Sequence, residues 1–176
     1  MPEDDGKADD EKILIPVKYP ETCDTLLNMA MLMRNEKLSR GLIALNVVYD
    51  DLDATYNQQE GQRLLEQIEK KAAAADVQVQ TQVRLATNIA NGIKHAFKEY
   101  DASEIILGQH IHDNSTRRFW GQFAQSLFNG LNRQIIIARC TIPLNTIRVF
   151  HVAVPSRAEY EPGFYRWLER VSRMVT

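Results

Sequence analysis

The chain has 176 residues, the size of one ordinary domain, with 44% hydrophobic and 25% charged residues. This balance excludes disordered, collagen-like and disulfide-scaffold proteins. The net charge is −2, but residues 1–12 sum to −4 and the remaining residues to +2, so the body of the chain has little electrostatic attraction for nucleic acid or an anionic membrane.

The sequence also gives expectations about the compartment of the chain. No apolar run approaches the roughly 20 residues that span a bilayer, and the N-terminal residues are acidic rather than basic. Cys23 and Cys140 lie far apart in sequence and form no metal-ligand or redox motif, so both are expected to be reduced. We therefore expect a cytoplasmic segment that does not itself insert into the membrane.

Residues 1–12 have no hydrophobic periodicity and are expected to form an acidic flexible tail. Apolar runs or apolar–polar alternation then predict five strands, at residues 13–17, 42–48, 77–84, 105–108 and 134–138. The alternation in residues 77–84 is typical of a half-exposed strand at the edge of a sheet. Helical patterns lie between the strands, and Thr22 and Thr87 are the predicted N-caps of the first and third helices.

The strict alternation of strands and helices predicts an α/β domain over residues 13–140. Apolar strands that alternate with helices form a parallel sheet with helices on both faces. Right-handed crossovers then favour a doubly wound five-stranded sheet of order 3-2-1-4-5, which places the third strand at an edge. A different strand order within the α/β class is the alternative.

Residues 141–176 exceed this domain and resemble its beginning. Pro143 marks a linker, residues 147–154 are strand-like, and Phe164, Trp167, Leu168 and Val171 form an apolar helical stripe. VFHVAVPSRAEY followed by a helix is similar to ILIPVKYPETC followed by a helix near the start of the chain. We therefore expect a linker and the truncated start of a second β-α repeat, within a longer protein.

The predicted ligand site lies where the first and fourth strands end. In a doubly wound sheet the crevice opens at the carboxyl ends of the central strands. Lys18 follows the first strand, and Arg117 lies in the polar segment that leads into the next helix. Gly108 ends the fourth strand, where the missing side chain would let the backbone approach a ligand closely. The free N–H groups of that helix would suit a phosphate. The alternative is a solvated loop with arginines on its rim.

Element order, the LNVV strand and the polar loop after IILG resemble the universal stress protein family, which has an adenine nucleotide alpha hydrolase-like fold. Nucleotide-binding members carry Gly-x2-Gly-x9-Gly followed by Ser or Thr in this loop. Gly108 and Gly121 match the first and third glycines, whereas Ile111 and Gln122 replace the second glycine and the hydroxyl residue. The binding positions that the resemblance implies are Val17, Lys18, Val47, Gly108, Thr116, Arg117, Gly121 and Gln122.

The departures from the family pattern bear on the ligand. Ile111 adds a branched side chain where backbone would approach phosphate, and Gln122 removes a small hydroxyl donor. Lys18 stands where nucleotide-binding members carry an aspartate, so it replaces an acceptor by a cation. No cofactor is implied with certainty; ATP or another adenine nucleotide and a different anionic ligand are both candidates.

A second resemblance is carried by LGQHIHDNSTRRFWGQFAQSLFNGLNRQIIIAR and the following PLNTIRVFHVAVPSRAEYEPGFYRWLERV, and it covers roughly residues 13–176. This sequence is similar to the cytoplasmic C-terminal region of bacterial sodium/proton antiporters. The resemblance implies a regulatory module whose partner is the transmembrane antiporter domain of the same full-length protein, in the inner membrane. The alternatives are a nucleotide-binding universal stress protein and a dimerisation module without ligand.

The remaining motifs give no catalytic or metal site. His110 and His112 form an HxH pair, but no third ligand is evident, so no metal is expected. No nucleophile elbow or catalytic constellation is found, and the chain is expected not to be an enzyme. The apolar fifth strand needs cover, from residues 146–154 or from a second copy, and a homodimer is the expected assembly.

Overall fold

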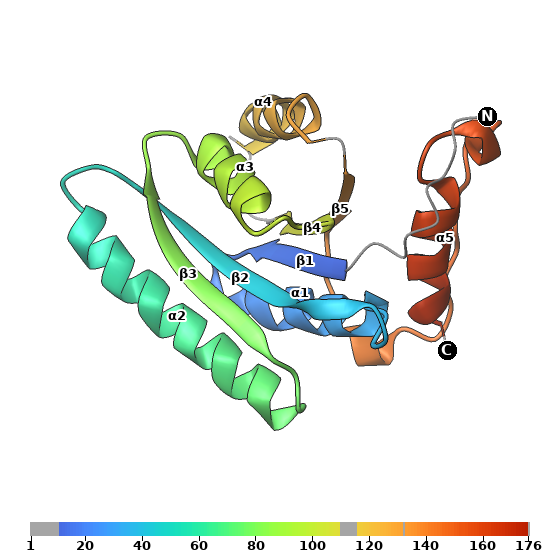
Figure 1. Ribbon diagram of the computed structural model, residues 1–176, viewed down its shortest axis with the longest axis horizontal. Helices are drawn as coiled ribbons and strands as arrows, with labels where there is room; N and C mark the ends of the chain where they lie inside the picture. The colour runs from blue at the N-terminus through green and yellow to red at the C-terminus, as the bar shows by residue number, and fades with distance from the viewer. Residues whose placement is uncertain (1–10, 110–115, 132, 176) are drawn as a thin grey trace.

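The computed structural model describes residues 11–109, 116–131 and 133–175 (Figure 1). Its strands are β1 (Glu11–Pro16), β2 (Ser39–Tyr49), β3 (Val79–Ala86), β4 (Glu104–Gly108) and β5 (Gln134–Ala138). They form one parallel sheet in the order β3-β2-β1-β4-β5. The predicted fold class and strand order are therefore confirmed, and β3 lies at an edge as expected.

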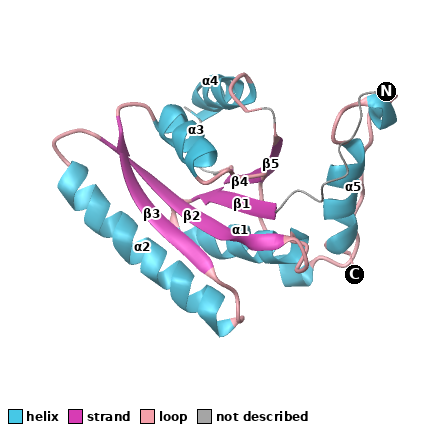
Figure 2. Cartoon of the chain, viewed as in Figure 1, coloured by secondary structure: helices cyan, strands magenta, loops and turns pink. Residues whose placement is uncertain are grey.

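The helices are α1 (Pro20–Met33), α2 (Ala54–Ala74), α3 (Ile89–Glu99), α4 (Thr116–Phe128) and α5 (Phe164–Arg173). The pair α1 and α2 covers one face of the sheet, and α3 and α4 cover the other (Figures 1 and 2). Side chains alternate along β1, so Ile13 and Ile15 pack in the core beneath α1 and α2, whereas Leu14 packs in the core beneath α3 and α4. None of the helices in the described ranges combines the length and hydrophobicity that a bilayer span requires.

The sheet begins two residues earlier than the sequence indicates. Glu11 donates its N–H to Leu38 O at 2.9 Å. The Lys12 N–H donates to Ser103 Oγ at 3.0 Å, and its Nζ donates to Tyr100 O at 3.1 Å. Glu11 and Lys12 are therefore part of β1 rather than of the predicted tail, because neighbouring elements supply partners for their polar groups. The remaining residues of that tail lie outside the described part.

Both predicted helix caps are wrong. Pro20 opens α1, a position where the missing proline N–H costs no hydrogen bond, so Thr22 lies inside the helix and its hydroxyl donates to Tyr19 O at 3.1 Å. At α3 the cap is Asn88 rather than Thr87, because the Asn88 side chain accepts a hydrogen bond from the Asn91 N–H at 3.0 Å.

The C-terminal segment keeps its predicted helix but not its predicted strand. Residues 147–154 belong to no strand, and the chain reaches α5 through two 3-10 turns, Leu144–Thr146 and Ala158–Tyr160. A strand requires a neighbour to receive its backbone hydrogen bonds, and no strand among the described residues runs beside this stretch. The expectation of a strand at 147–154 is therefore wrong, and the second repeat stays a prediction.

Candidate functional site

The parallel register brings the exits of β1 and β4 together. Ile13 pairs with Glu104 and Leu14 with Ile105, so β1 and β4 run in the same direction and their carboxyl ends, at Pro16 and Gly108, lie at the same edge of the sheet. Val17 is buried and donates its N–H to Leu45 O at 2.8 Å, which extends the hydrogen bonding of β1 with β2 by one residue. Lys18 is exposed, and its Nζ lies 5.4 Å from the centre of the Tyr19 ring.

A buried amide fixes the exit of β1. Asn46 on β2 donates its Nδ2–H to Val17 O at 2.9 Å. The same side chain packs against α2 at Gly61, where a Cβ would lie 2.3 Å from Asn46 Oδ1. The sequence analysis did not identify Asn46, although one amide within the apolar run LIALNVV was a signal for it. Asn46 therefore holds the backbone from which Lys18 projects.

The glycine that ends β4 has a packing role. A Cβ at Gly108 would lie 3.0 Å from Leu26 Cδ1 of α1, tighter than ordinary van der Waals contact. The sequence interpretation attributed this glycine to close approach of a ligand. The structure shows that the missing side chain makes room for α1, because helix and strand approach closely at this point.

The start of α4 follows the loop that leaves β4. Thr116 and Arg117 begin the helix, with only their backbone described, and residues 110–115, including Ile111 and the HxH pair, lie outside the described part. Gly121 and Gln122 are exposed, and a Cβ at Gly121 would meet no described atom within 4 Å. The helix backbone does not need a glycine there, so the packing within the described part leaves that face of α4 open.

Val47, unlike the other predicted positions, contributes to packing between the sheet and α3. It lies on β2 opposite Arg84, and its side chain packs against α3, where a Cβ at Gly92 would lie 2.8 Å from Val47 Cγ1. The structure thus places Val17, Lys18 and Gly108 at the ends of two neighbouring strands, at one edge of the sheet, and shows Val47 in the packing beneath α3.

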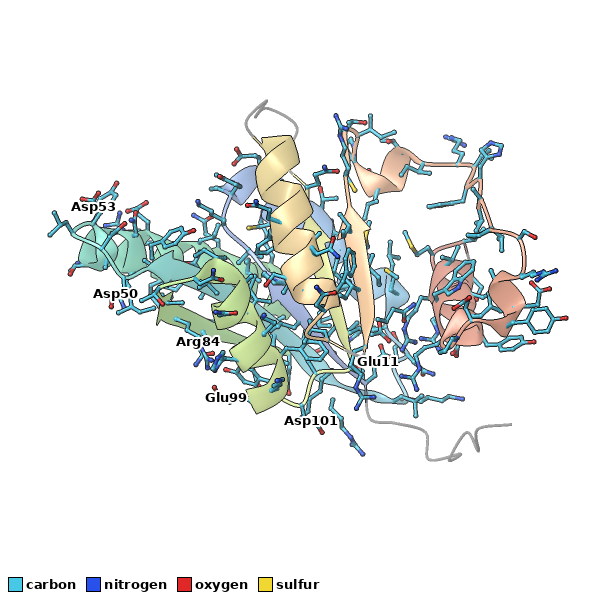
Figure 3. The ribbon with its side chains drawn as sticks, turned by 90° about the horizontal axis from the view of Figure 1, so that it is seen from above. Glu11, Asp50, Asp53, Arg84, Glu99 and Asp101 are labelled. Carbon is cyan, nitrogen blue, oxygen red and sulfur yellow. The ribbon has the colours of Figure 1, made fainter. Side chains whose placement is uncertain are left out.

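The other reactive or charged groups described near the ends of β1 and β2 do not form a catalytic or metal site. Burial raises the pKa of Cys23 to about 12, so its thiol is protonated, and the thiol donates to Tyr19 O at 3.0 Å. Asp50 and Asp53 are exposed after β2 (Figure 3). No group of three potential metal ligands occurs among the residues that the structure describes.

A second feature, which the sequence analysis missed, lies at the opposite ends of the same two strands. Glu11 opens β1 and Glu104 opens β4, and both carboxylates are buried together with Arg170 of α5. Arg170 donates from Nε to Glu104 Oε1 at 2.6 Å and from Nη2 to the same oxygen, and Nη2 lies 2.9 Å from Glu11 Oε2. We call Glu11, Glu104 and Arg170 the Arg170 cluster.

Neighbouring groups complete the Arg170 cluster. Glu11 Oε1 accepts a hydrogen bond from the Asn35 N–H at 2.9 Å, and Arg173 Nη1 lies 3.7 Å from Glu11 Oε2. Burial raises the pKa of Glu11 despite these partners. Burial alone would lower the pKa of Arg170, but its hydrogen bonds and attraction to Glu104 reverse the direction and raise it. The Arg170 guanidinium is thus shared by two carboxylates that the fold removes from water, and Arg173 supplies a second positive charge beside Glu11.

The fold is similar to those of several proteins of known structure. The structure resembles that of hypothetical protein MJ0577, with a TM-score of 0.61 and 17% identity, over 76% of this chain and 98% of that one. It also resembles a universal stress protein family member from Burkholderia pseudomallei, with a TM-score of 0.55 and 17% identity, over 76% and 98% of the two chains. A universal stress protein solved in complex with cAMP gives a TM-score of 0.56 and 10% identity, over 73% and 96%.

At these identities the structural likeness shows the fold alone. A search of curated proteins finds no significant match in sequence. The sequence profile of the universal stress protein family matches residues 11–139, which is most of the chain and coincides with the sheet and its four covering helices. The chain belongs to the universal stress protein family.

Proposed function

We propose that the chain is a ligand-sensing module that binds a phosphate-bearing ligand of the nucleotide class at the exits of β1 and β4. The observation that carries this proposal is the parallel pairing of β1 with β4, which directs the carboxyl ends of both strands, followed by Lys18 and ending at Gly108, to the same edge of the sheet. This is the carboxyl end of the central strands, where doubly wound sheets bind their ligands. The structurally similar universal stress protein that was solved with cAMP supports a nucleotide as the class of ligand.

The charge of the site favours an anion. Lys18 is exposed where nucleotide-binding members of the family carry an aspartate, so the position offers a cation rather than an acceptor for sugar or base. The N-terminus of α4 adds free N–H groups and the positive end of a helix dipole. Sensing rather than turnover is part of the proposal, because Ile111 and Gln122 replace a glycine and a hydroxyl residue of the family's loop pattern.

Calorimetric titration of the purified chain with ATP, cAMP and inorganic phosphate tests this proposal. We expect saturable binding of a nucleotide, and we expect Lys18→Ala to weaken it about threefold to tenfold, since an exposed charge–phosphate contact contributes roughly 1 kcal/mol. Lys37→Ala is the matched control, because Lys37 is also exposed but precedes β2 at the other end of the sheet. If no nucleotide binds or shifts the melting temperature at millimolar concentration, the proposal fails.

We further propose that this module regulates a cation/proton antiporter from the cytoplasmic side of the inner membrane. The family profile ends at residue 139, so residues 140–176 lie beyond the family domain. Much of the antiporter-like stretch, PLNTIRVFHVAVPSRAEY and the helix after it, falls in this extra part. The reading frame around the segment tests the proposal: about a dozen apolar spans of some 20 residues upstream are expected, and their absence would rule it out.

A homodimer is the proposed assembly, through the outer edge of β5. Among the described residues β5 pairs only with β4, and Ile137 on β5 is exposed. An unpaired apolar edge strand is a site where a second chain adds. Sedimentation equilibrium at tens of micromolar is expected to give twice the chain mass for the wild type and the monomer mass for Ile137→Lys. A monomeric wild type would contradict this assembly.

A further inference from the structure

The contacts of α5 differ in kind from those of the helices that cover the sheet. Six residues of α1 are buried, and five of them are apolar side chains larger than alanine. In α5 the buried residue is Arg170. Phe164 and Trp167 are half-buried and make an edge-to-face contact with each other, within the helix itself. The position of α5 therefore depends on a charged side chain more than on an apolar face.

The Arg170 cluster determines where α5 can sit. The guanidinium enters between the first residues of β1 and β4, where Glu104 and Glu11 are both nearly inaccessible to water. Outside the cluster, Arg173 Nη1 donates to Met33 O at the end of α1 at 3.2 Å, and Met174 packs against the edge of the core. Each of the three charges is removed from water only where it meets its partners, so the cluster specifies one docked position of α5.

The chain that leads to α5 is attached to the body at few points. Leu144 packs against the core beneath α1, and Ala158 is buried beside α5. Between them, residues 145–157, which we call the strap, are exposed except for two half-buried side chains. Within the described part of the chain, the N–H groups of residues 148–157 make no backbone hydrogen bond. Figure 2 shows the strap as a long connection that runs alongside α5 and takes no part in the sheet.

We propose that residues 158–175 form a latch that docks on the sheet and leaves it as a unit, with Glu11 and Glu104 as the receptor for the guanidinium of Arg170. The docked state closes the starting ends of β1 and β4. The released state opens the carboxylates of Glu11 and Glu104 to water and exposes Arg170 and Arg173 of α5 to a partner. The strap permits this change because it carries no sheet pairing that release would break. The receptor lies at the strand ends opposite Lys18, so the latch is independent of the proposed ligand.

Hydrogen exchange of the full-length wild-type chain, read by mass spectrometry, tests the latch directly. Peptides that cover residues 164–173 are expected to exchange at least tenfold faster than those from β1 and β2. Their exchange is also expected to depend less on denaturant, because latch release exposes less surface than global unfolding. Exchange of α5 only at the rate of global unfolding would overturn the proposal, because α5 would then be an integral part of the domain.

Substitution of Arg170 tests the receptor. Arg170→Met keeps an unbranched side chain without charge, and it is expected to accelerate exchange in α5 more than tenfold while peptides from β2 and α2 keep their protection. Arg148→Met is the matched control, since Arg148 lies on the exposed strap, and it is expected to change neither rate. Unchanged exchange of α5 in Arg170→Met would overturn the latch.

A third variant covers the case in which unpaired carboxylates unfold the chain. Arg170→Met combined with Glu11→Gln and Glu104→Gln removes every charge of the Arg170 cluster while keeping side chains of similar size. The proposal expects fast exchange of α5 in this variant on a protected sheet. Wild-type protection of α5 in it would show that apolar contacts hold the helix and that the carboxylate pair is not its receptor.

Discussion

At the exit of β1, one amide and one glycine determine the path of the chain. Asn46 is buried and donates to the carbonyl of Val17, and its Oδ1 makes no hydrogen bond within the described part. The carbonyl side of the amide packs against Gly61. A glycine in the middle of a helix normally reduces stability relative to alanine, so its presence in α2 indicates that close packing outweighs helix propensity.

Gly61→Ala is expected to reduce the free energy of unfolding by about 1–3 kcal/mol. The new Cβ would lie 2.3 Å from Asn46 Oδ1, so Asn46 or α2 must shift and the hydrogen bond to Val17 O is strained. Urea denaturation measures the loss. Gly121→Ala on α4 is the control, because its Cβ meets no described atom within 4 Å, and it is expected to gain up to about 1 kcal/mol from helix propensity. A neutral Gly61→Ala would refute this role.

At the scale of elements, the start of α3 shows why sequence patterns misplace helix caps. Thr87 and Asn88 are adjacent, exposed and both of cap-forming type. Asn88 has extended backbone angles and accepts from the Asn91 N–H, so it is the cap. The end of β3 at Ala86 decides which of the two residues reaches this position, and that depends on the register of β3 with β2.

Asn88→Ala is therefore expected to reduce the free energy of unfolding by about 1 kcal/mol, because the Asn91 N–H loses its partner. Thr87→Ala is expected to change it by less than about 0.5 kcal/mol, as is usual for exposed residues outside such features. Thermal and urea unfolding of the two variants side by side measures the difference. A larger loss for Thr87→Ala than for Asn88→Ala would contradict the observed cap.

At the scale of the whole molecule, the Arg170 cluster joins the two ends of the chain. Figure 3 shows Glu11 on the side of the sheet that faces α5, with Asp50 and Asp53 at the far end. Glu11 lies at the start of the first strand and Arg170 in the last helix, so residues that are distant in sequence form a buried ion pair. The domain therefore has one end with exposed polar groups after β2 and an opposite end closed by α5.

The raised pKa of Glu11 predicts a pH dependence of stability. Because burial raises this pKa above the ordinary 4.5, the folded chain holds the proton more tightly than the unfolded chain. The contribution of Glu11 to the free energy of unfolding therefore falls as the pH rises from about 4.5 through the raised pKa. Glu11→Gln removes this titration, so its stability relative to the wild type is expected to increase across that window and then level off.

Urea denaturation at a series of pH values measures this effect. Glu36→Gln, which changes an exposed glutamate, is the control and is expected to follow the wild-type profile. A constant difference between Glu11→Gln and the wild type from pH 4.5 to pH 8 would show that Glu11 does not titrate differently in the folded chain.

Local pattern alone predicted the parallel sheet and its strand order. Alternation of apolar runs such as LIALNVV with helical stripes forces a covered parallel sheet, and right-handed crossovers leave few topologies. The strand order also puts the carboxyl ends of β1 and β4 at one edge, so the sequence assigns Lys18 and Gly108 to the same edge of the sheet, while a ligand there stays a prediction. These features depend on the hydrophobic periodicity and on the order of the elements along the chain, and both can be read from the sequence.

Only the tertiary structure decided which polar residues are buried and what faces them. Nothing local distinguishes Glu11 from the acids of residues 1–10, or Arg170 from the other arginines of the C-terminal segment. Their burial arises when β1, β4 and α5 meet, because a charge is buried only where the fold supplies its partner. For the same reason IRVFHVAV, a good strand by composition, belongs to no strand: pairing is a property of neighbours, which only the folded chain provides.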